Sequence, residues 1–429
     1  MMLTVHPTGR IEGRIRLPAS KSYSIRAFII AACGGRSRVI APSDCDDAKV
    51  ALTVARNLGA CCQRLSANQW QIQPATKRKK TATIHVGESG TALRFLLPLL
   101  PFSYTAAEVV GRGTLLGRPN RHLTTLLRQQ GLDICGEGEA EGVPIHFRGG
   151  QLRGGTMTID GSLSSQFISA LLIACPRLNE DVVLKIAGRT LVSTEYIAMT
   201  RQILAKSGIE VQRVDDRTYR IPGQQKFRGL KNFTVPSDYG LAAFPMAAGL
   251  LLPSDLILEG YFPDDLVQAD GYILKFLTQM GTRFTHTRQG IRLKGPQRLK
   301  GGRFSLKDCP DLVPIMAVLA LFAQGKTVLT DIHHARAKES DRISDLRREL
   351  LKIGADVAEQ SNGLVIMPQP VYKNNVELDP HHDHRLAMAF AVLGLKVGAR
   401  IKDSECVAKS YPGFVRDMKK LKAQVSPTS

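Results

Sequence analysis

The sequence predicts an α/β protein built of two lobes, and three observations lead to that expectation. The chain has 429 residues, which are too many for one small domain and enough for two to four. Its 43% hydrophobic and 22% charged residues are ordinary for a globular chain. One unit recurs along it: an amphipathic helix, a glycine where that helix ends, and two short strand-like runs around a polar turn.

This repeat can be recognised in five copies, which cover residues 52–72, 123–147, 200–221, 272–293 and 343–366. The helix-ending glycines stand 72 to 77 residues apart, at positions 59, 131, 208, 281 and 354. A sixth helix of the same kind is expected at residues 414–421. Six units divide naturally into two lobes of three, so we expect a boundary near residue 235 and a ligand pocket between the lobes.

A second kind of helix alternates with the first and is apolar on nearly every face, which predicts burial all round. Its six starts fall at residues 22, 89, 164, 237, 310 and 383, and five of them carry Ser or Asp where a helix cap belongs. Capping alone explains those residues. It does not explain Arg26, Arg94 and Arg385 in first turns, where the helix dipole disfavours a cation. We therefore interpret these starts as a pocket for phosphates and carboxylates.

Charge and cysteine content limit the partners and the compartment. The net charge of +20 indicates anionic partners, whether nucleic acid, anionic lipid or phosphorylated metabolites. The eight cysteines form no CxxC pair and are typical of a reducing compartment. The first residues lack a signal-peptide pattern, and no apolar run reaches the roughly 18 residues of a membrane span. We expect a soluble cytoplasmic protein without membrane contacts.

Seven sequence blocks resemble the 5-enolpyruvylshikimate-3-phosphate synthase family, in a match that covers nearly the whole chain. They are 18–22 with Arg26, 90–92 with Arg94, 118–119, 160–162 followed by 164–167, 338–342, 383–388, and Lys409. The resemblance implies two lobes, 20–234 and 1–19 plus 235–429, each of three βαβαββ repeats with buried helices. This is an inside-out α/β barrel with pseudo-threefold symmetry and an active site in the interlobe cleft. The first lobe would serve mainly shikimate 3-phosphate, the second mainly phosphoenolpyruvate and proton transfer.

The resemblance also implies an activity, transfer of the enolpyruvyl group of phosphoenolpyruvate to the 5-hydroxyl of shikimate 3-phosphate, with release of phosphate. This addition–elimination through a tetrahedral intermediate belongs to chorismate and aromatic amino acid biosynthesis. The two substrates bring two phosphates and two carboxylates together, so several cations must offset their repulsion. The residues implied for phosphoenolpyruvate are Lys21, Gly90, Arg118, Gln166, Arg342, Arg385 and Lys409. Those implied for shikimate 3-phosphate are Lys21, Ser22, Arg26, Ser164, Ser165, Gln166, Ser193, Tyr196, Asp311 and Lys338.

The chemistry needs a base for the attacking hydroxyl and an acid for C3 of phosphoenolpyruvate. The family places Asp311 beside the hydroxyl and Glu339 as the proton carrier, with Lys21 as a second candidate acid. The sequence leaves open which of them carries each proton in each step. No cofactor and no metal are expected, and the protein is expected to be a monomer.

Two residues depart from the family pattern and are kept outside the predicted site. Glu88 stands where an amide is usual near phosphoenolpyruvate, so its carboxylate is expected to be paired with a cation, turned away or protonated. His334 stands where the best-known bacterial members have Asn. The segment 236–240 also lacks the Ser-Ser that is common there.

Two other functions compete with this interpretation. The related UDP-N-acetylglucosamine enolpyruvyl transferase uses a reactive cysteine in a mobile loop, and the corresponding segment 111–121 has none. A nonenzymatic nucleic-acid binder would use the basic charge, including the run 77–80, but aromatic residues are only 6% of the chain. We expect that run to be a solvated turn, and we expect no specific nucleic-acid contact.

The run His381–His384 could ligate a metal, but it overlaps a recognised helix start.

Overall fold

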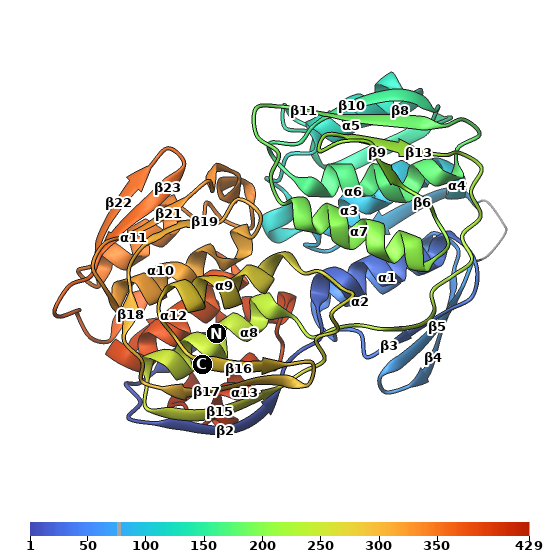
Figure 1. Cartoon of the computed structure of the whole chain (residues 1–429). Helices are drawn as coiled ribbons and strands as arrows, with labels where there is room; N and C mark the ends of the chain where they lie inside the picture. The colour runs from blue at the N-terminus through green and yellow to red at the C-terminus, as the bar shows by residue number, and fades with distance from the viewer. Residues whose placement is uncertain (75–78, 429) are drawn as a thin grey trace. The chain divides into compact units, whose positions relative to one another are not determined.

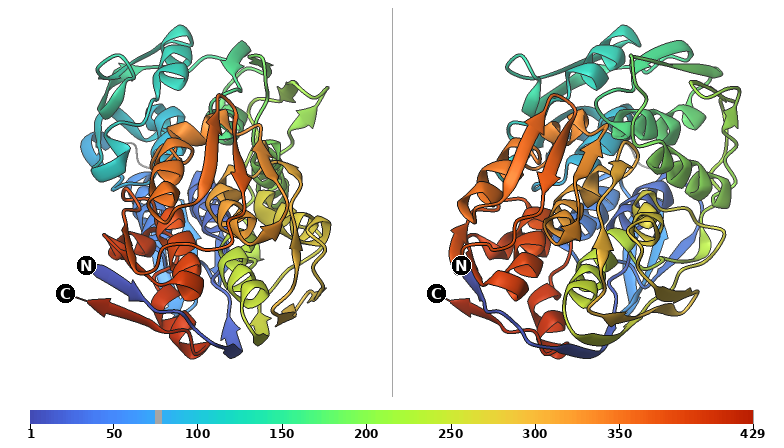
Figure 2. Two further views of the ribbon diagram at one scale, coloured as in Figure 1. Left: turned by 90° about the vertical axis from the view of Figure 1, so that its left-hand side faces the viewer. Right: turned by 60° about the vertical axis from the view of Figure 1, so that its left-hand side comes forward.

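A computed structural model describes residues 1–74 and 79–428 (Figure 1). The chain divides into an N-terminal unit, Ala19–Val235, and a C-terminal unit, Met1–Pro18 with Pro236–Ser429. The C-terminal unit holds both chain ends: β1 (Met2–Val5) pairs antiparallel with β26 (Val425–Thr428), and Figure 2 shows them side by side. Lys77 and Arg78 of the basic run lie outside the described residues.

The repeating amphipathic helices predicted from the sequence are confirmed. They are α2 (Asp46–Asn57), α5 (Arg121–Gln129), α7 (Thr194–Lys206), α9 (Tyr272–Gln279), α11 (Ser344–Lys352) and α13 (Phe414–Lys420). The five predicted glycines follow the first five helices and have φ between +80° and +98°, a left-handed conformation that glycine adopts without a Cβ clash. Each of these glycines therefore ends its helix and turns the chain into the following strand pair.

The second, apolar set of helices is also confirmed. Its members are α1 (Lys21–Cys33), α3 (Gly90–Leu96), α6 (Ser165–Ala174), α8 (Tyr239–Leu251), α10 (Val313–Leu321) and α12 (His384–Val397). All nine residues of α10 are buried. Short helical turns precede or extend several of them: η1 (Leu97–Leu99), α4 (Leu100–Ser103), η3 (Cys175–Arg177) and η5 (Pro310–Leu312).

Five of these helices have the side-chain caps that their sequence predicts. The capping oxygens belong to Ser20, Ser89, Ser164, Asp238 and Asp383, and each accepts a hydrogen bond from a backbone N–H two or three residues later. For α1 the expected start at Ser22 is wrong, because the helix begins at Lys21 and Ser20 is its cap. The sixth helix, α10, continues from η5 and has no side-chain cap.

The described residues form six four-stranded sheets with one shared topology. In each sheet two neighbouring strands are parallel, and the remaining two add antiparallel, as a βαβαββ unit requires. The N-terminal unit contains β14 (Lys231–Thr234)–β3 (Ser37–Ile40)–β5 (Gln69–Gln73)–β4 (Cys61–Ser66), β6 (Lys79–His85)–β7 (Tyr104–Val110)–β9 (Gly142–Gly150)–β8 (Leu132–Glu137), and β10 (Gly155–Asp160)–β11 (Val182–Ala187)–β13 (Thr218–Ile221)–β12 (Gln212–Arg213).

The C-terminal unit repeats this pattern three times. Its sheets are β2 (Ile11–Arg16)–β15 (Ser254–Glu259)–β17 (Gly290–Gly295)–β16 (Phe284–Thr287), β19 (Arg303–Ser305)–β21 (Thr327–Thr330)–β23 (Gly363–Met367)–β22 (Asp356–Gln360), and β24 (Val376–Leu378)–β25 (Ala399–Ile401)–β1–β26. A two-stranded sheet joins β18 (Leu299–Lys300) to β20 (Ala323–Gln324).

Within the C-terminal unit the helices α8, α10 and α12 pack against one another, and the three sheets lie outside them (Figure 1). Their apolar side chains form one continuous buried core. This inside-out arrangement confirms the α/β class, because helices that are apolar all round need neighbours on every side. It also places the polar starts of three buried helices in one small region.

Among the described residues, no helix combines the length and apolar character needed to cross a membrane.

Candidate functional site

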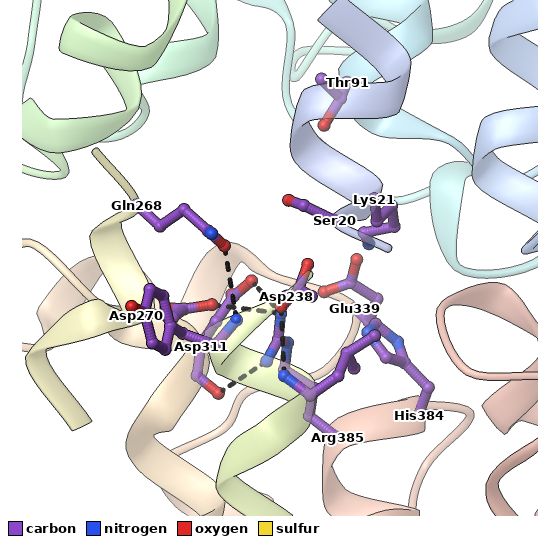
Figure 3. Close-up of polar contacts among 12 residues, drawn as sticks. Ser20, Lys21, Thr91, Asp238, Gln268, Asp270, Asp311, Glu339, His384 and Arg385 are labelled. Carbon is purple, nitrogen blue, oxygen red and sulfur yellow. Dashed lines mark hydrogen bonds and ion pairs between the residues drawn. The ribbon is translucent and has the colours of Figure 1, made fainter. Parts of the chain in front are cut away.

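In the C-terminal unit, Asp311 lies between two buried arginines. Its Oδ1 is 2.7 Å from Nη1 of Arg342, and its Oδ2 is 2.8 Å from Nη2 of Arg385. Asp311 belongs to η5, whereas Arg385 lies in the first turn of α12 (Figure 3). The fold thus joins two predicted phosphoenolpyruvate ligands to the predicted base.

Arg342 is fully buried and is surrounded by carboxylates. Besides Asp311 it contacts Asp383 through Nε at 2.6 Å and Glu339 through Nη2 at 3.0 Å. Burial alone would lower the pKa of Arg342, but Asp383, Asp311 and Glu339 outweigh it and raise that pKa well above its usual value. Arg342 therefore stays charged and fixes both predicted proton carriers.

The same cations control the protonation of Asp311. Burial would raise the pKa of Asp311, but Arg385, Arg342 and Lys338 hold it well below its ordinary range, with Glu339 opposing them. Asp311 is therefore a carboxylate, which is the form a general base needs.

Asp270 is a further buried carboxylate of this cluster, and the sequence analysis missed it. Its Oδ2 lies 3.5 Å from Nη2 of Arg385, and a Cβ on Gly240 would come within 2.2 Å of that oxygen. Burial raises the pKa of Asp270 to about 7, with Asp311 and Asp238 adding to the shift and Arg385 opposing it. No motif marks this residue, which stands in the short helical turn η4 (Ala269–Gly271) before α9.

The remaining predicted residues of this unit are Lys338, which acts on the charge of Asp311, and Lys409. Lys338 ends the short helix η6 (His333–Ala337) as its cap, and Lys409 is 7% exposed at the end of η7 (Ser404–Lys409). His334 is 1% exposed, and burial, Lys338 and His333 together lower its pKa to about 3. It is thus a neutral imidazole in the same region as Asp311.

In the N-terminal unit, Lys21 opens α1 and its Nζ lies 3.1 Å from Asp47 Oδ2. One turn later Arg26 is 1% exposed and donates from Nε to Thr200 Oγ1 at 2.8 Å. Its other nitrogens donate to the carbonyls of Ser22 and Tyr196. Burial lowers the pKa of Arg26 to about 10, so it stays charged.

Arg94 organises a second group of predicted ligands. Its Nη1 donates to Gln166 Oε1 at 2.6 Å, its Nη2 donates to the carbonyl of Pro119 at 2.9 Å, and its guanidinium lies 4.9 Å from the ring centre of Phe167. Gln166 in turn donates from Nε2 to Thr91 Oγ1 at 2.9 Å. The expected first-turn positions of Arg26 and Arg94 are wrong, because Arg26 is the sixth residue of α1 and Arg94 lies in the last turn of α3. Arg94 holds Gln166 in place.

Arg118 packs directly on Gly90. A Cβ built on Gly90 would lie 2.6 Å from Nη1 and 2.8 Å from Cζ of Arg118, closer than real Cβ contacts. Arg118 is 5% exposed, and Gly90 is the first residue of α3. Two predicted phosphoenolpyruvate ligands are therefore in contact, at a helix N-terminus.

The predicted serines lie at helix starts. Ser164 caps α6 by accepting from Gln166 N at 3.3 Å, and Ser165 is the first residue of that helix. Ser193 precedes α7 with φ of +58°, an uncommon conformation for a non-glycine residue that is enriched at functional sites. The carbonyl of Ser193 accepts from Tyr196 N at 3.1 Å.

No group of three or more His, Cys, Asp or Glu residues in the described part of the chain is arranged to hold a metal ion. The run His381–His384 diverges: His381 Nε2 lies 3.3 Å from Glu349, His382 contacts Asp403, and His384 is buried in α12.

With these residues placed, comparison with known proteins decides the family. A family profile described as EPSP synthase (3-phosphoshikimate 1-carboxyvinyltransferase) matches residues 5–418. The chain belongs to the EPSP synthase family. This confirms the resemblance read from the seven sequence blocks and classes the chain with transferases.

Individual relatives match the chain over nearly its whole length. A 3-phosphoshikimate 1-carboxyvinyltransferase of Methanothrix thermoacetophila is 36% identical over 97% of each chain. One of Methanococcus aeolicus is 33% identical over 99% of this chain and all of its own. The solved EPSP synthase of Acinetobacter baumannii has a TM-score of 0.79 at 25% identity, with full coverage of both chains. The enolpyruvyl transferase NikO of Streptomyces tendae has the same TM-score at 18% identity, which shows the shared fold.

Proposed function

We propose that this chain transfers the enolpyruvyl group of phosphoenolpyruvate to the 5-hydroxyl of shikimate 3-phosphate and releases phosphate. The observation that carries the proposal is Asp311 held between Arg342 and Arg385 in a member of the EPSP synthase family. A carboxylate next to two buried cations suits a reaction that joins a hydroxyl to an anionic enol ether.

In the first step the hydroxyl oxygen attacks C2 of phosphoenolpyruvate, its proton passes to a base, and C3 gains a proton from an acid. In the second step the adduct loses a C3 proton and expels phosphate, which forms the enol ether product. We assign Asp311 as the base, with Glu339 and Lys21 as the groups that exchange the C3 proton. Glu339 is placed for this role beside the base, since Arg342 contacts both Asp311 and Glu339.

Binding of phosphoenolpyruvate would itself make Asp311 a stronger base. Arg342 and Arg385 now neutralise Asp311, and an anion that binds either arginine would take up part of that positive charge. The pKa of Asp311 would then rise towards its ordinary value, which makes it a stronger base once the substrate is bound.

The other ligand assignments follow the same logic of charge and position. We assign Lys21, Gly90, Arg118, Gln166, Arg342, Arg385 and Lys409 to phosphoenolpyruvate. We assign Lys21, Ser22, Arg26, Ser164, Ser165, Gln166, Ser193, Tyr196, Asp311 and Lys338 to shikimate 3-phosphate. The two helix starts at Gly90 and Ser165 support this assignment, since their N–H groups suit phosphate and carboxylate oxygens.

The test is phosphate release by the purified protein. Phosphate should appear when both substrates are present and not with either one alone, and a chelator should leave the rate unchanged. Absence of turnover with shikimate 3-phosphate would refute the assignment. Turnover with UDP-N-acetylglucosamine in its place would favour the related enolpyruvyl transferase activity.

A further inference from the structure

Two loops of the N-terminal unit interlock beside Arg118. One, residues 87–90, connects β6 to α3, and the other, residues 111–118, follows β7. They are joined by a backbone hydrogen bond from Arg112 N to the carbonyl of Gly87 at 2.9 Å. The second loop contains the short helix η2 (Gly113–Leu115), from which Arg118 N donates back to the carbonyl of Leu115 at 3.2 Å.

The side chain of Glu88 provides a second link between these loops. Its Oε2 accepts hydrogen bonds from Thr114 N at 3.4 Å and from Thr114 Oγ1 at 3.2 Å. Thr114 is in the first turn of η2, where backbone N–H groups have no partner inside the helix. The carboxylate therefore caps the turn that leads to Arg118.

Gly113 allows the carboxylate to come this close. It has φ of +56°, and a Cβ on it would lie 2.5 Å from Cδ of Glu88 and within 2.7 Å of both carboxylate oxygens. Any side chain at position 113 would displace Glu88. Close packing on a glycine in the left-handed region is a second observation, independent of the hydrogen bonds, that fixes where Glu88 lies.

The same first loop also touches the guanidinium itself. Gly90, two residues after Glu88, is in contact with Arg118. Beyond Arg118, the amide of Asn120 donates to the Arg118 carbonyl at 3.1 Å. Arg118 is thus held by the turn that precedes it, by Gly90 and by Asn120. Glu88 holds that turn through Thr114.

We propose that Glu88 is a positioning residue for phosphoenolpyruvate binding: its carboxylate holds the Gly113–Leu115 turn through Thr114 and so sets the place of the Arg118 guanidinium. The proposal rests on the proposed function, which assigns Arg118 to that substrate. It explains how a carboxylate can stand beside a site for an anion, because its Oε2 is turned to Thr114. In this role Glu88 acts as a hydrogen-bond acceptor for Thr114.

An acceptor role and a charge role predict different results for two substitutions. Glu88→Gln keeps an oxygen that can accept both bonds from Thr114, so the KM for phosphoenolpyruvate should stay within about twofold of the natural protein. Glu88→Ala removes the acceptor and should raise that KM by about 5- to 10-fold, while kcat and the KM for shikimate 3-phosphate stay within about twofold. Thr114→Val, which keeps only the N–H donor, should give an intermediate rise.

Matched variants separate this effect from general damage to the fold. Glu180 accepts a hydrogen bond from Gly154 N at 3.1 Å on the exposed surface of the same unit. Glu180→Ala therefore deletes a comparable turn contact and should leave all kinetic constants unchanged. Arg118→Ala should raise the KM for phosphoenolpyruvate more than Glu88→Ala does, and combining the two should add little, because both act through one guanidinium.

The proposal is overturned if Glu88→Ala leaves the KM for phosphoenolpyruvate unchanged, or if Glu88→Gln raises it as much as Glu88→Ala. A fall in that KM in both variants would also overturn it, since it would mean that the Glu88 charge repels the substrate. Failure of the proposed function is a separate outcome: the natural protein would release no phosphate, or Arg118→Ala would leave the KM for phosphoenolpyruvate unaltered.

Discussion

Arg342 and Arg385 are buried cations that depend on the acidic side chains around them. Arg342 is fully buried and contacts Asp311, Glu339 and Asp383, and Arg385 contacts Asp311 and Asp270. Breaking a buried ion pair by removing one partner typically costs about 3–5 kcal/mol, because the other charge stays behind unpaired. Each carboxylate in this cluster therefore affects stability as well as chemistry, and substitutions there need to keep hydrogen-bonding shape.

Asp311→Asn tests the base with the least structural damage. Asparagine keeps the size and one of the two oxygens that face arginines, although its NH2 stands opposite the other arginine, and it cannot accept the hydroxyl proton. We expect turnover to fall by about 10²- to 10⁴-fold. Shikimate 3-phosphate should bind at least as tightly, because a negative charge near an anion is removed. Steady-state kinetics and calorimetric binding check both points, and near-normal turnover would move the role of base to another group, with Glu339 the first to examine.

Gly90→Ala tests the contact between Gly90 and Arg118. The new methyl group would lie 2.6 Å from Nη1, so the end of the arginine side chain must move. The KM for phosphoenolpyruvate should rise by about 3- to 10-fold, with little change for shikimate 3-phosphate. Gly117→Ala is the matched control, since a Cβ at that neighbouring position meets no atom within 4 Å. Equal effects of the two substitutions would contradict the prediction.

His334 predicts a pH dependence of stability. Burial, Lys338 and His333 lower the pKa of His334 from 6.5 to about 3, with Asp311 opposing them. The unfolded chain therefore binds the proton more readily, so this residue costs stability as the pH falls from 6.5 towards 3. His334→Asn should remove about 2 kcal/mol of the stability lost between pH 7.5 and 5.0, measured as the variant's smaller change in urea unfolding free energy. Parallel pH curves for the two proteins would refute this.

At the residue scale the sequence predicts helix starts better than it predicts partners. Ser164 and Asp383 were identified as caps because local spacing alone sets that role. Anion binding by Arg26 and Arg94 stays a prediction, and the structure adds that each also donates to groups of its own chain, which local spacing does not reveal. Asp270 was missed altogether, because its neighbours in space come from residues far away in the chain.

At the scale of elements, the amphipathic helices are the part of the fold that the sequence predicts best. An amphipathic helix that ends in glycine is encoded within about a dozen residues, and periodicity detects it. Periodicity does not predict the parallel strand pairings. The strand β14 pairs with β3, and β2 pairs with β15, across some 190 to 240 residues. Such pairings depend on how whole units fold back, which no local pattern records.

The glycine that ends α11 can be used to test how much its left-handed backbone conformation contributes to stability. Gly354 has φ of +80°, and a Cβ there would meet no atom within 4 Å. Gly354→Ala should therefore lower the free energy of unfolding by about 1 kcal/mol, through backbone strain alone. Gly354→Asn should cost less, since asparagine tolerates the left-handed region. Urea unfolding of the two variants measures the difference, and equal losses would mean that a contact, not the backbone, sets the effect.

At the scale of the whole molecule, the number and spacing of the repeats predict the division into six units. Six units of one length, each too small to bury its own apolar helix, must share cores, and three sheets around three helices satisfy that need in the C-terminal unit. The count did not show that the first residues complete a sheet with the last ones. That closure depends on β1 lying between β25 and β26, a long-range pairing.

The net charge of +20 gives the prediction for the molecule as a whole. A strongly basic protein attracts anionic substrates over distances that salt screens, since the Debye length falls from about 30 Å at 0.01 M to about 8 Å at 0.15 M. The kcat/KM for phosphoenolpyruvate should therefore drop several-fold over that range, while kcat changes little. Chloride and sulfate at equal ionic strength separate screening from occupation of the site. If screening alone acts, chloride and sulfate should lower kcat/KM equally. If sulfate also binds at Arg118 or Arg342, it should raise the KM for phosphoenolpyruvate further, by competition. A kcat/KM that is independent of both salts would show that the basic excess does not steer the substrate.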